Sequence, residues 1–371
     1  MEKFSVISSP REIYKKMLDD INSAKKSIYL ETYIFSKDEI GNQFRDALIK
    51  KAKEGIKVFV LIDGLGSGDL RIRLHKLFRI DKSLGFGAGL DKKYFKELVN
   101  NKGEIRFFKD IRYVLRLFSS NHERNHRKLL IVDNKISYIG SVNITSSCLD
   151  WRELVLRLEG EIAAHFIDSF NYHWELANKE ITRKKIKLIL HKGFEILQDL
   201  PGDKKMLTEG KYRRLINNAK KDILIETPYL IPPWRIRRAL ERAVKRGVEV
   251  KLLLPYNSDI KILDIVRDRY LGRFYKKGIK IYYYAGILHS KLLLVDNKFF
   301  ILGSSNLDYR ALIHQYEINI LGRDKKIITS LKNYFNSGLK HSNLFDYEEW
   351  KSRSSIRKVM QHILTRIKNY L

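Results

Sequence analysis

Along this chain, stretches with the composition of β-strands alternate in a regular order with stretches whose apolar residues have the spacing of an α-helix. Residues 24–32 (AKKSIYLET) are rich in β-branched and aromatic side chains, which is typical of a strand. Residues 47–63 (ALIKKAKEGIKVFVLID) begin with the spacing of an amphipathic helix, which Gly55 closes, and continue into a second strand. Strands that alternate with helices predict an α/β fold with a parallel or mixed sheet.

The same order of elements occurs again later in the chain. Residues 219–227 (AKKDILIET) repeat residues 24–32 at an offset of 195 positions. Residues 239–255 (ALERAVKRGVEVKLLLP) repeat residues 47–63 at an offset of 192 positions. The chain is therefore predicted to contain one structural unit twice.

Two tandem lobes follow from this repeat, residues 1–195 and residues 212–371. We expect each lobe to be a mixed sheet flanked by helices, with a pseudo-twofold relation between the lobes. The linker is expected at residues 196–211, around the turn-forming sequence Leu-Pro-Gly-Asp at residues 200–203.

A twenty-residue phrase is also present twice, at residues 126–145 (HRKLLIVDNKISYIGSVNIT) and residues 289–308 (HSKLLLVDNKFFILGSSNLD). The copies lie 163 positions apart and share six residues at identical spacing: His126/His289, Lys128/Lys291, Asp133/Asp296, Gly140/Gly303, Ser141/Ser304 and Asn143/Asn306. Because the repeat preserves polar side chains as well as apolar spacing, we predict two half-sites that face each other in one active site between the lobes.

The spacing within each copy places its polar groups together. His126 and Lys128 are two residues apart, so on an extended strand both point to one face, over a cleft. Leu129 and Ile131, like Leu292 and Leu294 in the second copy, would then point to the opposite face, toward a core. A hairpin turn after Asp133 would return Asn143 toward the start of the strand.

These residue types suit the chemistry of a phosphate diester, which is anionic and resists attack. Lys128 and Lys291 can neutralise its oxygens, while Asn143 and Asn306 donate hydrogen bonds. One histidine can attack phosphorus to form a phosphohistidine, and the other can protonate the leaving alkoxide and later deprotonate the acceptor. The sequence treats the two histidines alike, and we favour His126 as the nucleophile.

Carboxylates are expected behind the histidines, because nearby cations would otherwise lower the pKa of each ring. Glu153 and Glu317 are the candidates, since they lie 27 and 28 residues after their histidines in strand-like stretches. For Asp133 and Asp296 we expect a structural role in capping the turn. The motif serines Ser141 and Ser304 are also assigned structural roles.

The amino-acid composition narrows the classes of molecule that this protein is expected to bind. The 371 residues carry 72 Lys+Arg against 43 Asp+Glu, a formal net charge of +29, which favours nucleic acid or an anionic membrane surface. The lone Cys148 fits a reducing compartment and argues against a cysteine-rich metal site. No signal peptide or apolar membrane span is recognised, so any membrane contact is expected to be peripheral.

Two segments have the composition of membrane-contacting surfaces. The first lobe has 29 residues more than the second, which must lie within residues 64–125, where basic residues mix with Leu70, Ile72, Leu74, Leu77, Phe78, Leu115, Leu117 and Phe118. A C-terminal helix at about residues 354–371 places apolar residues on one stripe: Ile356, Val359, Met360, Ile363, Leu364, Ile367 and Tyr370. Each segment either touches lipid or packs on its own lobe.

The doubled His-x-Lys-x4-Asp-x6-Gly-Ser-x-Asn motif resembles the phospholipase D superfamily. Residues 41–67 (GNQFRDALIKKAKEGIKVFVLIDGLGS), the Thr-Pro-Tyr turn at 227–229 and residues 289–312 (HSKLLLVDNKFFILGSSNLDYRAL) narrow the resemblance to bacterial cardiolipin synthases, over roughly residues 20–325. The chain is similar to a shorter, peripheral type without N-terminal transmembrane helices.

The resemblance implies a transferase that needs no metal or other cofactor and acts on anionic phospholipids, phosphatidylglycerol and cardiolipin, at the cytoplasmic face of a bacterial membrane. It also implies catalytic roles for two half-sites. The first half-site is His126, Lys128, Asn143 and Glu153, and the second half-site is His289, Lys291, Asn306 and Glu317.

Two other hypotheses use the same residues or the same charge. A metal-independent nuclease or phosphodiesterase would use the same pocket, although the apolar content of the 64–125 segment disfavours a nucleic-acid groove. A non-catalytic binder of anionic surfaces is disfavoured because both motifs are intact.

The sequence His122-Glu-Arg-Asn-His126 matches a zinc-protease motif, but the flanking Ser and Asn residues predict a loop where that site requires a helix.

Overall fold

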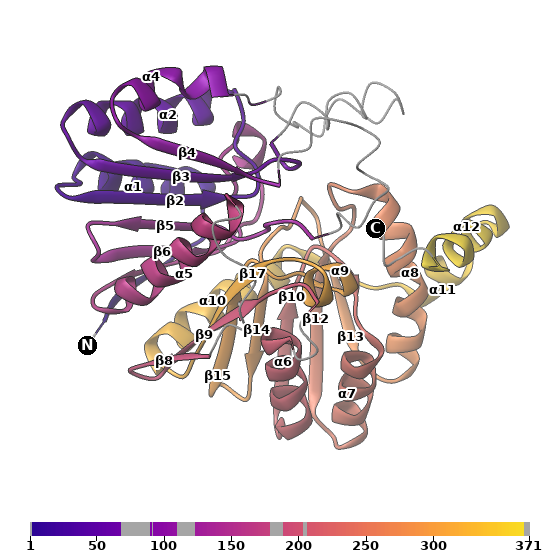
Figure 1. Ribbon diagram of the computed structural model, residues 1–371. Coiled ribbons are helices and arrows are strands. Elements are labelled where there is room, and N and C mark those ends of the chain that lie inside the picture. Colours follow the sequence, from indigo (N-terminus) through magenta and orange to yellow (C-terminus); the bar gives the residue numbers. More distant parts are fainter. Residues whose placement is uncertain are drawn as a thin grey trace. The chain divides into compact units, whose positions relative to one another are not determined.

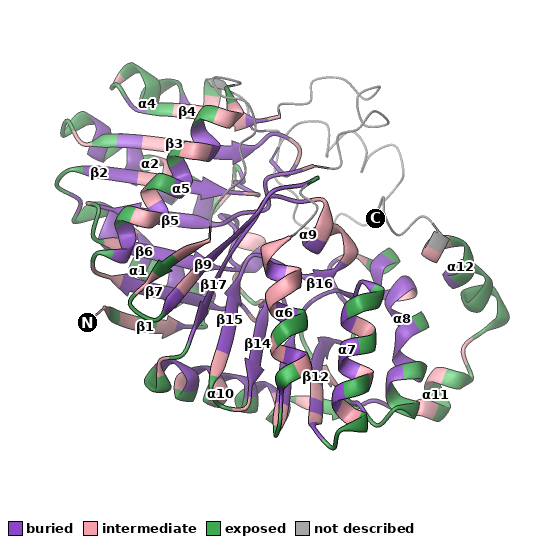
Figure 2. Ribbon diagram, turned by 60° about the horizontal axis from the view of Figure 1, so that its bottom comes forward, coloured by how far each residue is buried: buried purple, intermediate pink, exposed green. Residues whose placement is uncertain are grey.

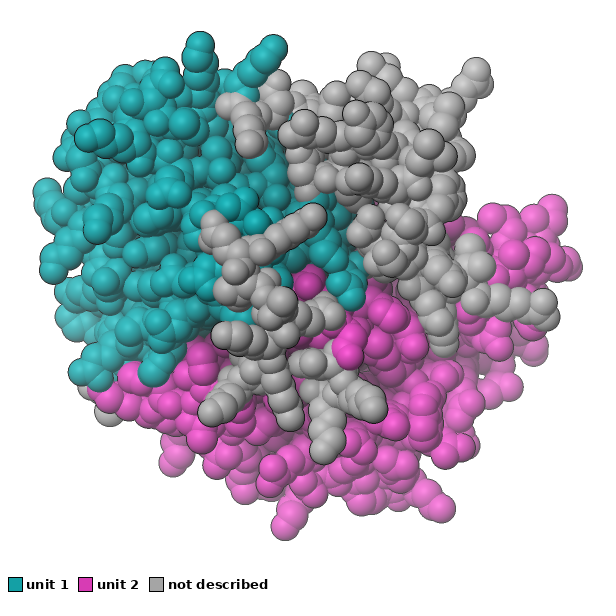
Figure 3. Space-filling view, viewed as in Figure 1, with its two compact units in different colours: residues 1–187 teal, residues 188–371 magenta. Residues whose placement is uncertain are grey.

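The structure is a computed structural model that describes residues 2–67, 90, 92–109, 123–178, 188–202 and 206–366 (Figure 1). The chain divides into two compact units, residues 1–187 and residues 188–371, which Figure 3 shows in different colours. Most of the 64–125 segment that the sequence singles out, including the eight apolar residues named above, lies outside the described residues. Each unit contains one large mixed sheet with helices on both faces, which confirms the predicted fold class.

The first unit alternates strands and helices in the order that its sequence predicts. Its described elements are β1 (Lys3–Ile7), α1 (Pro10–Asn22), β2 (Ser27–Thr32), α2 (Glu39–Lys53), β3 (Lys57–Asp63), the short helices η2 (Lys92–Phe95) and α4 (Lys96–Asn100), β4 (Glu104–Phe108), β5 (Leu129–Val132), β6 (Ile136–Gly140), η4 (Ser146–Cys148), β7 (Val155–Glu159) and α5 (Ile162–Ala177).

The seven strands of this unit are ordered β1-β7-β6-β5-β2-β3-β4. β2, β3 and β4 run parallel, whereas β5, β6 and β7 form an antiparallel meander that joins the sheet at β2. The amphipathic helices α1 and α2 pack against one face of the sheet, and α5 packs against the other face (Figure 1). Because both faces are covered, the sheet is buried throughout its centre.

The second unit repeats this arrangement with additions at its edges. Its described elements are β8 (Ile189–His191), β9 (Phe194–Asp199), α6 (Leu207–Asn218), β10 (Asp222–Glu226), β11 (Leu230–Ile231), α7 (Trp234–Lys245), β12 (Glu249–Pro255), α8 (Lys261–Lys276), β13 (Lys280–Tyr284), β14 (Leu292–Val295), β15 (Phe299–Gly303), β16 (Leu307–Asp308), α9 (Tyr309–Ile313), β17 (Glu317–Gly322), α10 (Lys325–Lys340), β18 (Ser342–Leu344), α11 (Tyr347–Lys351) and α12 (Ser355–Arg366).

Strand order shows how closely the two units correspond. The nine-stranded sheet runs β18-β13-β12-β10-β14-β15-β17-β9-β8, so that β17-β15-β14-β10-β12-β13 matches β7-β6-β5-β2-β3-β4 of the first unit. In addition, β9 pairs antiparallel with β17 as β1 pairs with β7. The helices α6, α7 and α8 contribute to the core on one face, and α10 contacts strands of the same sheet.

Strand β9 occupies part of the segment 196–211 that the sequence assigns to a linker. Residues 194–199 (FEILQD) pair with β17, and four of these six residues, Ile196 to Asp199, are buried in succession. The short polar sequence that follows, Pro201-Gly202, forms the expected turn. The strand pairing places β9 with the second unit, because its partner is more than a hundred residues later in the chain.

The C-terminal helix α12 is helical as its apolar spacing predicts, but only one side of it packs. Gln361 is buried and Leu364 packs against the core of the second unit, while Arg357 pairs with Asp268 of α8 at 2.7 Å. Ile367 and Tyr370, at the end of the predicted stripe, lie outside the described residues. Figure 2 shows most of this helix exposed. None of the described helices is long and apolar enough to cross a membrane.

Candidate active site

The histidine and lysine of each motif lie immediately before a central strand of their sheet. His126 and Lys128 precede β5, and His289 and Lys291 precede β14. All four side chains are buried, with between 2% and 6% of their surface exposed. The Lys128 ammonium donates a hydrogen bond to the His126 carbonyl oxygen at 2.7 Å, and Lys291 donates to the His289 carbonyl in the same way. This shared contact fixes each lysine beside its own histidine.

The two half-sites lie at strand ends and not on an open sheet face, which corrects the sequence-based expectation. All residues of β5 and of β14 are buried, including Leu130 and Val132, which have the same parity as His126 and Lys128. The expectation that one face would border a cleft was wrong because helices cover both faces of each sheet. The histidine and lysine of each half-site lie where a strand begins.

The motif asparagines differ between the two units. Asn143 Oδ1 accepts a hydrogen bond from the backbone N–H of Ile34 at 3.3 Å. In contrast, Asn306 Oδ1 is buried and has no hydrogen-bond partner among the described residues. The Asn306 side chain instead bonds to Asp308, a contact that opposes the rise in the Asp308 pKa caused by burial. A buried polar oxygen without a partner is uncommon in native proteins.

Each motif serine binds the glutamate that the sequence assigns to its half-site. Ser141 Oγ donates to Glu153 Oε2, and Ser304 Oγ donates to Glu317 Oε2. The same serines accept from the backbone N–H groups of Leu154 at 3.0 Å and Ile318 at 2.9 Å. Both glutamates are fully buried, and each serine anchors a carboxylate at or just before the start of the next strand, β17 for Glu317 and β7 for Glu153.

Gly140 and Gly303 permit this anchoring, because the neighbouring strands approach them closely. A Cβ atom added at Gly140 would lie 2.3 Å from the Leu154 carbonyl oxygen, and one at Gly303 would lie 2.4 Å from the Ile318 carbonyl oxygen. Any larger residue would push the glutamate strand away from the motif strand. The duplicated glycine is thus explained by backbone packing.

Asp133 and Asp296 hold the hairpin turns. Each aspartate and the asparagine after it adopt positive φ values between 53° and 56°, the left-handed pair that tight hairpin turns require. The Asp133 carboxylate accepts hydrogen bonds from three successive backbone N–H groups at residues 25–27, at 2.7 to 3.1 Å. The Asp296 carboxylate accepts the same set of bonds from residues 220–222. These contacts tie each motif to the start of the neighbouring antiparallel strand, β2 or β10.

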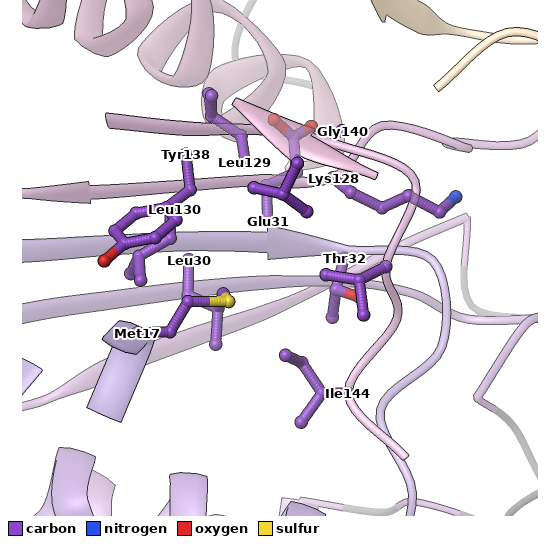
Figure 4. Close-up of a pocket in the computed structure, with 12 residues that line it drawn as sticks. Met17, Leu30, Glu31, Thr32, Lys128, Leu129, Leu130, Tyr138, Gly140 and Ile144 are labelled. Carbon is purple, nitrogen blue, oxygen red and sulfur yellow. The ribbon is translucent and has the colours of Figure 1, made fainter. Parts of the chain in front are cut away.

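A buried ionic network beside the first half-site is absent from the sequence-based predictions. The Arg127 guanidinium pairs with Glu31 at 3.0 Å, and both side chains are inaccessible to solvent. Asn125 Nδ2 donates to the other Glu31 oxygen at 2.7 Å. Burial raises the pKa of the Glu31 carboxyl, although the Arg127 charge opposes the rise. Figure 4 shows Glu31 and Lys128 near the small internal cavity, of about 20 Å³, that they help to line, with the Lys128 ammonium pointing away from Met17.

The Arg127 side chain continues this network into α5. Its Nη2 donates to Ser169 Oγ at 2.6 Å, and its Nη1 lies 3.4 Å from His173 Nε2. His173 Nδ1 lies 3.0 Å from the Ser169 carbonyl, which only accepts, so Nδ1 carries the proton and Nε2 accepts from arginine. Burial lowers the pKa of His173 well below its ordinary value, and the Arg127 charge lowers it further. His173 is therefore a neutral structural histidine.

In the second unit, hydroxyl groups bind the corresponding glutamate. Glu226 corresponds to Glu31 in the repeated phrases, and it accepts hydrogen bonds from Ser290 Oγ and from the Tyr334 hydroxyl at 2.9 Å. Ser290 stands between His289 and Lys291 as Arg127 stands between His126 and Lys128. The two glutamates occupy a repeated position in the sequence, but the residues that bind them, Arg127, Ser290 and Tyr334, carried no comparable signal.

A second buried pair fixes the residues just before the first histidine. The Arg124 guanidinium binds Asp63 at the end of β3, at 2.7 Å, and the Asn125 backbone N–H binds the same carboxylate at 2.9 Å. Asp63 also accepts from the backbone of the turn that follows β3. The segment 124–126 is thereby held against the end of the parallel strands. His122, the first residue of the zinc-protease match, lies outside the described residues.

Comparison with known proteins decides the family. A family model described as "Cardiolipin synthase, PLD-like domain" matches residues 17–174 and 212–339, which include both half-sites. The chain belongs to this family. The major cardiolipin synthase ClsA of Bacillus subtilis is 33% identical, with 94% of this chain and 71% of that protein covered. A cardiolipin synthase of Clostridium perfringens is 32% identical, with 95% and 73% covered.

The fold of this cardiolipin synthase-family chain also occurs in a more distant solved structure. The phosphatidylserine synthase of Haemophilus influenzae aligns with a TM-score of 0.74, at 16% sequence identity, and covers 99% of this chain and 95% of that one. At this identity the likeness concerns the fold alone. The family match itself confirms the resemblance drawn from the duplicated motif and favours a lipid substrate over the nucleic-acid alternative.

Within this family's fold, the structure brings every residue of each predicted half-site to the same end of its own sheet. Each end carries a histidine and a lysine whose ammonium group donates to the backbone carbonyl of that histidine. Each end also carries an asparagine after the return strand and a buried glutamate that a serine binds. A set of this composition can bind an anionic oxygen, supply a nucleophilic or acidic imidazole and hold a ring in one tautomer.

Proposed function

We propose that this chain is a cardiolipin synthase that transfers a phosphatidyl group from one phosphatidylglycerol molecule to another and releases glycerol. The observation that carries the proposal is the presence of two complete, buried half-sites in a chain of this family. A single half-site would offer one imidazole, whereas the two-step exchange needs a nucleophile and a separate proton carrier.

In the first step, one imidazole attacks the phosphorus of the donor lipid, and we assign this role to His126. The new P–N bond forms as the bond between phosphorus and the glycerol oxygen breaks. His289, in its protonated form, gives its proton to the departing alkoxide, so that glycerol leaves as a neutral alcohol. The product of this step is a phosphatidyl-histidine.

In the second step, a hydroxyl of the second phosphatidylglycerol attacks the same phosphorus. His289, now neutral, accepts the hydroxyl proton, and the P–N bond breaks to restore His126. The products are cardiolipin and the resting enzyme. If water takes the place of the lipid hydroxyl, the product is phosphatidic acid, as in phospholipase D hydrolysis.

Lys128, Lys291, Asn143 and Asn306 are proposed to stabilise the phosphoryl oxygens while these bonds change. The two ammonium groups are held by the carbonyls of their own histidines, which fixes their charges beside the reacting rings. The bond between the Asn306 side chain and Asp308 holds this amide at the second half-site. Glu153 and Glu317 are proposed to orient the imidazoles from positions fixed by Ser141 and Ser304.

Product analysis tests this function directly. Phosphatidylglycerol vesicles incubated with the purified chain and EDTA should yield cardiolipin and glycerol in equal amounts, because each transfer releases one glycerol. A single-stranded DNA substrate in a parallel reaction should remain intact. Cleavage of the DNA without any cardiolipin formation, across several vesicle and detergent conditions, would instead support the nuclease hypothesis.

We further propose that the enzyme binds the surface of an anionic membrane through α12, on the cytoplasmic side. Ile356, Val359, Met360 and Ile363 lie on one stripe of this helix and are between 43% and 74% exposed. Lys358 on the same helix is exposed as well, which suits contact with anionic headgroups. Apolar side chains on one helix face with adjacent cations are typical of helices that lie in a membrane interface.

Serine substitution of these four apolar residues together should weaken binding to phosphatidylglycerol vesicles at least about tenfold in a sedimentation assay. The reason is that burial of even one such side chain contributes about 1.5–3 kcal/mol, more than the roughly 1.4 kcal/mol that corresponds to tenfold. The matched control replaces three exposed apolar residues outside α12, Val99, Leu190 and Leu344, by serine. Equal binding by both variants would contradict the assignment to α12.

A further inference from the structure

The second unit contains a cavity of about 640 Å³ that belongs to neither half-site. It lies among the N-terminal parts of α6 and α7 and the short helix α9, and it is lined by Met206, Leu207, Glu209, Gly210, Lys211, Arg213, Arg214, Pro233, Trp234, Arg235, Tyr309, Leu312 and Ile313. The volume falls within the range of sites that hold small organic ligands, roughly 300–1,000 Å³.

Connectivity places this cavity at the same edge of the sheet as the second half-site. β10 ends at Glu226, which pairs with Leu292, so the residues just before β14, His289 and Lys291, lie at the carboxyl end of β10. Asn306 leads directly into β16 and then into Tyr309, which lines the cavity. The partner of β16 is β11, which leads into Pro233 and Trp234 on the other side of the cavity.

Cations outnumber anions in the cavity lining. Lys211, Arg213, Arg214 and Arg235 are accompanied by a single carboxylate, Glu209. Lys211 is paired with Glu195, and Arg213 lies 4.0 Å from Glu209. Neither Arg214 nor Arg235 has a carboxylate partner within the described part of the chain, and both are exposed. Their charges are therefore available to a ligand.

The start of α7 increases this positive character. Three arginines, at positions 235, 237 and 238, lie within the first five residues of the helix; its first turn has no acidic residue, and no side chain caps its backbone N–H groups. The N-terminus of a helix is already the positive end of its dipole, so cations there are unfavourable unless an anion is bound nearby. This arrangement is the reverse of the usual preference for acidic residues in a first helical turn.

The rest of the lining is apolar, which limits the class of ligand. Leu207, Leu312 and Ile313 contribute hydrocarbon surface, and Trp234 is 54% exposed beside the guanidinium groups of Arg235 and Arg238. Tryptophan commonly occupies positions with one apolar side and one polar side, as at a lipid interface. A ligand that matches both parts carries a phosphate and the beginning of a hydrocarbon chain.

We propose that this cavity binds the glycerophosphate headgroup and the first acyl carbons of the acceptor phospholipid. The inference rests on the proposed function, in which His289 takes the proton from the acceptor hydroxyl. A headgroup held by Arg214 and Arg235 would lie at the same end of the sheet as His289, the histidine assigned to its free hydroxyl. The ligand class is an anionic glycerophospholipid with a free headgroup hydroxyl.

The test uses the double variant Arg214→Gln/Arg235→Gln and the ratio of cardiolipin to phosphatidic acid formed from phosphatidylglycerol micelles. Both products arise from the same phosphatidyl-histidine, so the ratio reports the competition between lipid and water for that intermediate. We expect the ratio to fall about tenfold. The mole fraction of phosphatidylglycerol that gives half-maximal cardiolipin formation should rise by a similar factor.

The matched control is Arg242→Gln/Lys245→Gln, which removes the same charge from exposed positions at the far end of α7. Its product ratio should equal that of the unsubstituted chain. If the Arg214/Arg235 variant gives the same ratio and the same half-maximal mole fraction as the control, the cavity does not bind the acceptor. If the unsubstituted chain forms no cardiolipin at all, the proposed function itself fails, a result distinct from an unchanged ratio.

Discussion

Replacing His126 or His289 by alanine should lower cardiolipin formation by at least roughly two to four orders of magnitude. Each substitution removes a group that the two-step mechanism uses in both steps, either as the nucleophile and leaving group or as the proton donor and acceptor. Steady-state turnover of labelled phosphatidylglycerol measures the loss. An exposed histidine of the second unit, His341, provides the control, and His341→Ala should retain full turnover.

Mass spectrometry of acid-sensitive adducts separates the two histidines. A phosphatidyl adduct on His126 is expected in the unsubstituted chain after rapid quenching, and the His126→Ala variant should show none. An adduct found on His289 instead would reverse the assigned roles and leave the reaction unchanged. Turnover that survives either substitution at the level of the control would refute the catalytic assignment.

The largest expected effect on stability comes from the buried ion pair behind the first half-site. Arg127→Met should lower the free energy of unfolding by about 3–5 kcal/mol, because it leaves the Glu31 carboxylate buried without its cation. Denaturant titrations followed by circular dichroism provide the measurement. The loss should be smaller in the double variant Glu31→Gln/Arg127→Met, in which no unpaired charge remains and the new side-chain amide can still accept from Asn125.

A solvent-exposed arginine–aspartate pair in the same unit gives the matched comparison. Arg11 and Asp150 are 3.5 Å apart, with side chains 69% and 90% exposed. Arg11→Met should therefore cost less than about 1 kcal/mol, since water screens such pairs and solvates the partner that remains. If the Arg127 and Arg11 variants lost equal amounts of unfolding free energy, burial of the Glu31–Arg127 pair would not increase its contribution to stability.

The parts of this molecule that the sequence predicted are those present twice. Repetition identified the His, Lys, Ser and Asn residues of both half-sites, and the alternation of strands and helices predicted a mixed sheet in each unit. The glutamates were recoverable because Glu153 and Glu317 stand at nearly equal distances from their histidines. Asp133 and Asp296 could be assigned to the turn because an Asp-Asn-Lys sequence between two apolar runs has few other uses.

The residues that escaped prediction depend on partners that only the tertiary fold supplies. Arg127 could not be distinguished from other basic residues before its contacts with Glu31 and α5 were known. Likewise, nothing in the sequence indicated that Ser290 and Tyr334 would both donate to Glu226. The burial of β5 on both faces was missed because four consecutive apolar residues are compatible with one covered face or two. The cavity of the second unit forms where the first residues of α6, α7 and α9 come together, and no local sequence pattern predicts this arrangement.

Because helices cover both faces of each sheet, reactive groups are confined to the rim where strands give way to loops and short helices. The rim therefore holds two kinds of residue: those whose polar groups can face a ligand, and those, such as Arg127, whose buried contacts hold the strand end in place. A change of alcohol partner at low cost in stability has to come from residues of the first kind.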